Sequence, residues 1–210
     1  LKDVEFIDYL IKHGARYTND VIKAAKNSGA PGIIEMIEKI KPALTDKDVE
    51  GMSIFNALAA DKMEAVRLLI NNPKFEVNQQ DGQGRTPLIL AIIKGNTEAF
   101  SLLLQRKADC SIQDKNGKSA VFHAACSANP DFVKTLTEKK VDLNIKLYDD
   151  RTPIFSAGSA ETAEILIKAG LDIKAKDKSG MTPLHYAKTK EIAEVLINAG
   201  SDINALDNSH

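Results

Sequence analysis

A small polar residue recurs through the chain at a nearly constant spacing. Ser53, Thr86, Ser119 and Thr152 follow one another at intervals of 33 residues, and Thr182 comes 30 residues later. The surrounding letters recur as well: DGQGRTPLILAIIKGN begins at residue 81, DKNGKSAVFHAACSAN at 114, DRTPIFSA at 150 and DKSGMTPLHYA at 177. A period of this length predicts a solenoid, in which each unit buries its apolar face only by stacking on its neighbours.

Each unit of this pattern indicates a turn followed by two helices. The Asp-x-x-Gly tetrapeptide is typical of a tight turn, because Asp bonds its own backbone and Gly tolerates positive φ. Pairs such as Thr86-Pro87 predict a helix start, with Thr as N-cap and Pro at the first helical position. A second helix follows, with apolar residues at helical spacing, and Gly170 and Gly200 are placed to end it in the left-handed conformation.

These motifs resemble the ankyrin repeat family, whose repeats carry Asp-x-x-Gly-x-Thr-Pro-Leu-His-x-Ala, and TPLHYA from Thr182 is almost that pattern itself. The resemblance covers nearly the whole chain. It implies an all-α ankyrin-repeat solenoid of helix-turn-helix pairs joined by β-hairpin-like loops, with about six repeats plus partial ends. We expect a single ankyrin-repeat domain over residues 1–210, a fragment of a longer protein, with degenerate repeats in 1–45 and five clearer repeats in 46–205.

Several positions depart from the family pattern. Lys107 and Lys140 stand where the family has the Gly that ends the second helix, and Asp150 replaces the Gly of the turn. If the two lysines are left-handed, each costs about 1 kcal/mol. The last two repeats lack three residues after Gly158 and after Lys188. This deletion predicts a shorter turn between their two helices.

The charge and the aromatic content argue against a nucleic-acid ligand. The chain has a formal net charge of -1, 5% aromatic residues and no Trp, whereas nucleic-acid binding needs clustered positive charge or a stacking platform. No apolar run approaches the roughly 20 residues that span a bilayer. The two cysteines form no disulfide framework, and the first residues form no secretory signal. We therefore expect no nucleic acid, no membrane association and a cytoplasmic (intracellular) location.

The sequence offers no catalytic or cofactor-binding constellation. His123 and Cys126 form an H-x-x-C pair near Cys110, but a zinc site needs four ligands and no second pair is present. No Ser–His–Asp arrangement or phosphate-binding loop occurs. For His185, in the TPLH motif, the family resemblance implies a hydrogen bond to the backbone of a neighbouring hairpin. We expect no metal, no cofactor and no enzyme within these residues.

Basic residues occupy one column of the repeats. Arg85, Lys118 and Arg151 each precede the residue that opens a helix, and Met52 and Met181 hold this place in the flanking repeats. The family resemblance implies that the column points into the concave face of the solenoid. The alternative is that turns favour polar residues, so that three basic residues need no function. We predict that the column, together with exposed apolar positions, contacts a ligand that presents acidic groups flanked by an apolar residue. The predicted binding residues are Met52, Arg85, Ile93, Lys118, Tyr148, Arg151 and Met181.

The resemblance implies a protein–protein interaction scaffold that binds a protein ligand on its concave face. We expect it to be a monomer, because stacked repeats satisfy their interfaces along the chain. The alternative is a targeting or regulatory arm of a larger enzyme or effector whose catalytic part lies outside these residues. The full length of the parent protein discriminates between the two.

Two hairpin asparagines suggest a modification. Asn144 and Asn204 close the pattern Leu, five residues, Asp, apolar residue, Asn, which resembles the pattern that ankyrin-directed asparaginyl hydroxylases accept. The alternative is that these side chains only stabilise the hairpin by bonds to the backbone. In the corresponding loop Pro73 and extra residues disturb the spacing, so Asn78 is expected to be a poorer substrate.

Overall fold

The computed structural model describes residues 48–209. The chain divides into two compact units, Leu1–Asp48 and Val49–His210, and the description below concerns the second. The degenerate repeats expected within 1–45 lie outside the described residues.

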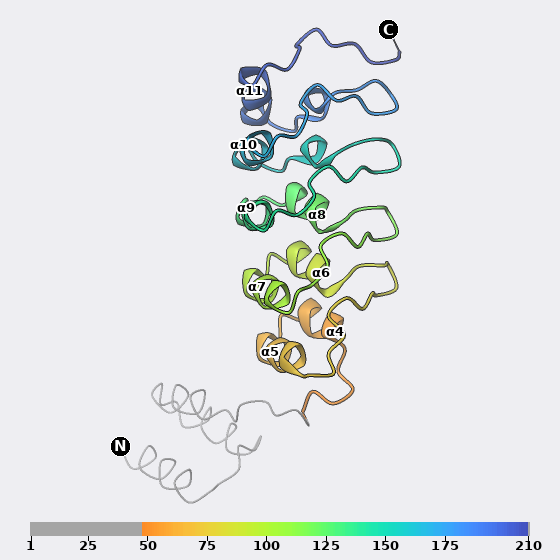
Figure 1. Cartoon of the computed structure of the whole chain (residues 1–210), viewed down its shortest axis with the longest axis vertical. Helices are drawn as coiled ribbons and strands as arrows, with labels where there is room; N and C mark the ends of the chain where they lie inside the picture. Colours follow the sequence, from red (N-terminus) through yellow and green to blue (C-terminus); the bar gives the residue numbers. More distant parts are fainter. Residues whose placement is uncertain (1–47, 210) are drawn as a thin grey trace, which may run out of the picture. The chain divides into compact units, whose positions relative to one another are not determined.

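Five pairs of helices stack along the described part of the chain (Figure 1). Each pair has an inner helix and an outer helix, and inner helices contact inner helices while outer helices contact outer helices. Residues 48–209 contain no β-strand, which confirms the all-α solenoid. The pairs are α4 (Ile54–Ala59) with α5 (Met63–Asn71), α6 (Pro87–Ile93) with α7 (Thr97–Gln105), α8 (Ala120–Cys126) with α9 (Asp131–Glu138), the 3₁₀ helix η1 (Pro153–Ser156) with α10 (Ala160–Lys168), and the 3₁₀ helix η2 (Pro183–Tyr186) with α11 (Lys190–Asn198).

A loop runs from each outer helix to the next inner helix and projects to the side opposite the outer helices (Figure 1). We call the tight turns in these loops fingers, and they comprise residues 81–85, 114–118, 147–151 and 177–181. In each finger the first residue donates its amide to the carbonyl of the fifth, at 2.9–3.0 Å. The fingers therefore close on themselves, and each one ends directly before an inner helix.

Local capping explains where the helices begin. The Thr86 hydroxyl accepts a hydrogen bond from the Ile89 amide at 3.2 Å, and Pro87 occupies the first turn, as the sequence predicts. On the outer helices, Asn96 caps α7 through the Ala99 amide at 2.9 Å. The hydroxyls of Ser119 and Thr152 are buried without a hydrogen-bond partner in the described part of the chain. At those two positions helix formation therefore rests on packing and not on a side-chain cap.

The core lies between the inner and outer layers. Leu88, Phe122, Phe132 and Leu136 are fully buried there, and each such side chain contributes about 1.5–3 kcal/mol when it leaves water. The rings of Phe100 on α7 and Phe132 on α9 meet edge to face, with centroids 4.9 Å apart. Contacts of this kind join each repeat to the next, because no single helix pair encloses its own apolar side.

The outer helices end in the left-handed conformation at four equivalent positions. Gly170 and Gly200 have φ of 90° and 100°, and Lys107 and Lys140 have φ of 59° and 55°. Asp150 also has positive φ, 68°, at the finger position that Gly84, Gly117 and Gly180 occupy elsewhere. The condition stated from the sequence is therefore met: both lysines are left-handed, a conformation that has a steric cost for any residue with a Cβ.

The prediction of a shorter turn between the helices of the last two repeats is wrong. Residues 94–96 link α6 to α7, and residues 157–159 link η1 to α10, so the two connections have the same length. The deletion falls instead on the inner helix, which is reduced to one 3₁₀ turn. The link stays because the chain must still reverse direction, and the Gly158 amide donates to the Ala125 carbonyl of α8 at 2.8 Å.

Candidate protein-binding face

The base of three fingers is held by an aspartate. One carboxylate oxygen of Asp81 accepts the amides of Gln83 and Arg85, both at 2.9 Å. Asp114 and Asp177 accept the equivalent pairs of amides at 2.8–3.0 Å. This is the predicted turn chemistry. In the finger 147–151, Leu147 takes the place of the aspartate and is buried.

The second oxygen of each finger aspartate reaches a different donor. The carboxylate of Asp114 lies 2.8 Å from His123 Nε2 on α8, and the carboxylate of Asp177 accepts the Tyr186 hydroxyl on η2 at 2.7 Å. In both cases the donor follows the aspartate by nine residues. Asp81 has an apolar residue at that distance and instead accepts Arg85 Nε at 2.8 Å. The bonds of Asp114 and Asp177 tie their fingers to the inner helices, whereas that of Asp81 stays within its finger; sequence reasoning missed all three.

We define the inner face as the surface between the fingers and the inner helices. The basic column follows it, since Arg85, Lys118 and Arg151 are each the last residue of a finger and directly precede the N-cap of an inner helix. Arg151 lies over the ring of Tyr186, 5.2 Å from its centroid. The structure therefore places all three basic residues of the column along the inner helices.

The three basic residues differ in their ionic partners. Arg85 pairs with Asp81 at 2.7 Å, and Arg151 pairs with Asp149 at 2.7 Å. No carboxylate lies within ion-pairing distance of Lys118 in the part of the chain that the structure describes. From the sequence the three cations of the column could not be distinguished. In the described part of the structure Lys118 is the one among them without a carboxylate partner.

Burial governs the titration of His123. It lowers the pKa of the imidazole below 6.5, and the charges of Lys118 and Arg85 lower it further, against the opposing effect of the Asp114 carboxylate. Burial by itself would raise the pKa of Asp114, but the hydrogen bonds from His123 and from two backbone amides hold it below 3.8. At neutral pH the pair therefore consists of a neutral imidazole and a carboxylate.

The remaining predicted binding residues are spread along the face. Met52 and Met181 are half-buried, each directly before an inner helix. Tyr148 is 78% exposed at the tip of its finger, and Ile93 is 45% exposed. Ile93 is the last residue of α6, so it lies at the end of the inner helix remote from its finger. The structure thus groups Tyr148 with the basic column and leaves Ile93 apart from it.

The hairpin asparagines are exposed, but they differ in their bonding. In the described chain the side-chain amides of Asn144 and Asn204 make no hydrogen bond, and only their backbone amides are held, by Asp142 and Asp202. The Asn78 side chain, in contrast, accepts the Asp109 amide of the next repeat at 2.9 Å.

The hydrogen bond of His185 differs from the one that the family resemblance implies. Its Nδ1 accepts the Thr182 amide of its own repeat at 3.1 Å, and among the described residues it does not bond to a neighbouring hairpin.

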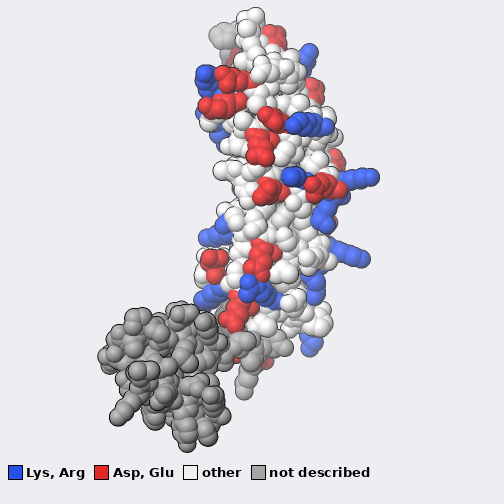
Figure 2. Space-filling model, turned by 90° about the vertical axis from the view of Figure 1, so that its left-hand side faces the viewer, with Lys and Arg blue, Asp and Glu red and all other residues white. Residues whose placement is uncertain are grey.

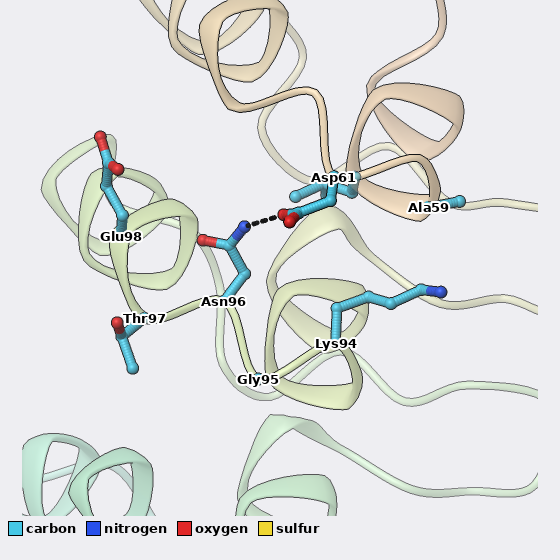
Figure 3. Close-up of a pocket in the computed structure, with 8 residues that line it drawn as sticks. Ala59, Asp61, Lys94, Gly95, Asn96, Thr97 and Glu98 are labelled. Atoms are coloured by element: carbon cyan, nitrogen blue, oxygen red, sulfur yellow. Dashed lines mark hydrogen bonds between the residues drawn. The ribbon is translucent and has the colours of Figure 1, made fainter. Parts of the chain in front are cut away.

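A separate recess of about 460 Å³ lies between the α4–α5 and α6–α7 links (Figure 3). Asn96 is directed at Asp61, with Nδ2 and Oδ1 3.4 Å apart, while Lys94 and Glu98 extend away to opposite sides (Figure 3). None of the predicted binding residues lines this recess. It is therefore not part of the inner face.

The outer helices present a different kind of surface. Lys and Arg side chains alternate there with Asp and Glu, without a large area of one sign (Figure 2). Three ion pairs lie on these helices, namely Arg67 with Glu98, Lys168 with Glu164 and Lys190 with Glu194. Exposed pairs of this kind contribute little to stability, and the surface is typical of a solvated face.

Within residues 48–209, no group of three or more His, Cys, Asp or Glu side chains is arranged to hold a metal ion. None of the helices described is both long enough and apolar enough to cross a bilayer.

Stacked helix pairs with projecting fingers define the chain as a helical-repeat solenoid. It belongs to the ankyrin repeat family: the family's sequence model, described as ankyrin repeats (3 copies), matches residues 21–114, 54–147, 91–177 and 146–207. Proteins of this family generally mediate protein–protein interactions and are typically non-catalytic. No curated protein matches the chain.

Proposed function

We propose that the chain is a scaffold that binds an acidic protein ligand on its inner face. The observation that carries this proposal is the column of Arg85, Lys118 and Arg151 at the bases of three successive fingers. Arg151 lies over the Tyr186 ring, and Met52 and Met181 hold the same place in the flanking repeats. Arg and Tyr side chains are frequent in the energetic centres of interfaces, and Met adapts to varied partners. The outer face offers no comparable column.

Charge complementarity predicts how such a ligand responds to mutation. Reversing Arg85 and Arg151 to Glu places two anions beside Asp81 and Asp149, so the face becomes repulsive to acidic groups. Association should slow by about tenfold or more at low salt, with a smaller effect near physiological ionic strength. Lys168 and Lys190 provide a matched control on the outer helices, because each also sits beside a carboxylate.

The test begins with affinity capture from a cell extract and identification of the captured protein by mass spectrometry. Its association rate is then measured by surface plasmon resonance with the Arg85→Glu/Arg151→Glu chain and with the Lys168→Glu/Lys190→Glu control. The proposal predicts a slower rate only for the first. Equal rates for the two variants would show that the ligand uses another face.

A further inference from the structure

Hydrogen bonds between successive fingers form a ladder along the face. The Lys115 amide donates to the Gln83 carbonyl at 2.9 Å, the Lys178 amide to the Asp149 carbonyl at 3.0 Å, and the Asn208 amide to the Ser179 carbonyl at 2.9 Å. In the first two cases the second residue of one finger bonds to the third residue of the finger before it, and Asn208 makes the same bond from the turn that begins at Asp207. The ladder fixes the spacing of the fingers where it is present.

The ladder is interrupted between the fingers 114–118 and 147–151. The corresponding groups there are the Tyr148 amide and the Asn116 carbonyl, and among the described residues no hydrogen bond joins them. The finger that follows the interruption is the one with Leu147 in place of the aspartate. The turn at 48–52 also makes no such bond to its follower, but it stands at the edge of the described stack and not at its centre.

Two side chains border the interruption and are available to a ligand. One side of the Tyr148 ring lies over Gly117, close enough that a Cβ at Gly117 would stand 3.1 Å from the ring. The rest of the residue is in solvent, since Tyr148 is 78% exposed. On the other side, Lys118 is the cation of the basic column that has no carboxylate partner in the described chain. An exposed aromatic ring and two backbone groups without a hydrogen bond among the described residues thus lie at the interruption, and the half-buried Lys118 follows Gly117 in the finger before it.

We propose that this interruption is the docking point for an extended peptide segment of the ligand that carries a carboxylate next to an apolar or aromatic side chain. The carboxylate pairs with Lys118, and the apolar side chain packs on the free part of the Tyr148 ring. The peptide backbone can hydrogen-bond to the Tyr148 amide or to the Asn116 carbonyl, neither of which has a partner among the described residues. The inference rests on the proposed function and specifies where on the inner face the ligand is held.

The charges around the interruption also set the direction in which the ligand segment binds, that is, on which side of Tyr148 its carboxylate lies. Asp149 and Asp150 lie on the Tyr148 side, and Asp149 is already paired with Arg151. A ligand carboxylate is therefore favoured on the Lys118 side and disfavoured beyond the tyrosine. Arg85 and Arg151 are weaker anchors, because a ligand carboxylate must compete there with Asp81 and Asp149.

The experiment uses a phage-displayed library of random 12-residue peptides, panned against the whole chain. Enriched peptides are synthesised with a fluorescent label, and their Kd is measured by fluorescence anisotropy. Tyr148→Ala and Lys118→Gln should each weaken binding by about tenfold. Tyr148→Phe keeps the ring and Lys178→Gln removes an exposed lysine from an intact step of the ladder, so both should bind within about twofold of the unmodified chain.

The outcomes separate this inference from the proposed function. Peptides that respond to reversal of Arg85 and Arg151 but not to Tyr148→Ala or Lys118→Gln overturn the inference and leave the inner-face scaffold standing. Peptides that respond to none of these variants contradict both. A library that yields no binding peptide overturns the extended-segment inference, because the docking point would then not recognise a linear peptide.

Discussion

The carboxylate of Asp114 and the imidazole of His123 lie 2.8 Å apart and join a finger to the inner helix α8. The aspartate also holds the amides of its own turn, at 2.8 and 3.0 Å. One buried carboxylate therefore fixes the shape of the finger and its position on the helix. The equivalent contact of Asp177 uses the Tyr186 hydroxyl, which does not titrate near neutral pH.

The burial of His123, which outweighs the opposing effect of the Asp114 carboxylate, makes the stability of the solenoid depend on pH. Burial lowers the pKa of His123 below 6.5, so below that pH the unfolded chain binds more protons at this residue than the folded chain. The contribution of His123 is fully present above the unfolded pKa and is lost as the pH falls through the folded pKa. Urea unfolding at about pH 7.5 and about pH 5.5 should show a larger loss for the unmodified chain than for His123→Gln, in which an amide replaces the imidazole. Equal losses in the two chains would contradict the expectation.

Gly158 is required by space at the junction between the long and short inner helices. A Cβ at this position would lie 2.5 Å from the Ser127 carbonyl oxygen and 2.6 Å from that of Cys126. Both are backbone atoms, so they do not move aside as a flexible side chain would. Gly158→Ala should lower the free energy of unfolding by about 1–3 kcal/mol. Gly82→Ala is the matched control, because nothing lies within 4 Å of its added Cβ, and it should change stability by less than about 0.5 kcal/mol.

The left-handed lysines offer a gain in stability. Lys107 and Lys140 have φ of 59° and 55° at the ends of outer helices, where Gly avoids the steric cost. Lys107→Gly and Lys140→Gly should each raise the free energy of unfolding by up to about 1 kcal/mol. Lys139 is adjacent but has φ of -80°, so Lys139→Gly should lower it instead. Urea unfolding of the three variants checks the opposite signs, and a loss on all three would show that the lysine side chains contribute packing at these ends.

The bonding of the asparagines separates a good hydroxylation substrate from a poor one. The side chains of Asn144 and Asn204 are exposed and make no hydrogen bond within the described residues, whereas the Asn78 side chain must first leave the Asp109 amide. Incubation with an ankyrin-directed asparaginyl hydroxylase, 2-oxoglutarate and iron should add one oxygen atom at Asn144 and Asn204 before Asn78. Peptide mass mapping locates the added oxygen. Absence of modification at both favoured sites would leave these residues with a role in the hairpin only.

Sequence alone determined the repeat, the starts of its inner helices and the ends of its outer helices. These features depend on residues that are close along the chain: a Thr that caps the helix after it, an Asp that bonds the amides of its own turn, and a residue forced to positive φ where a helix must stop. The column of Arg85, Lys118 and Arg151 was also visible, because a repeat places every equivalent residue at the same position. Local chemistry and periodicity therefore sufficed for the repeat architecture, and the resemblance to the ankyrin repeat family implied the face on which a ligand is expected.

The tertiary structure decided how the residues of that face differ from one another. Only the folded chain shows that Arg85 and Arg151 have carboxylate partners, whereas Lys118 has none within residues 48–209. It alone shows that the Tyr148 ring covers Gly117 where the ladder of finger bonds is interrupted. It also shows that the three-residue deletion shortens the inner helix and not the turn between the helices, where the sequence had placed it. In these cases residues of different repeats compete for the same space and for the same hydrogen-bonding groups. The sequence of one repeat does not show which residues of the neighbouring repeats lie beside it, so it could not predict the result.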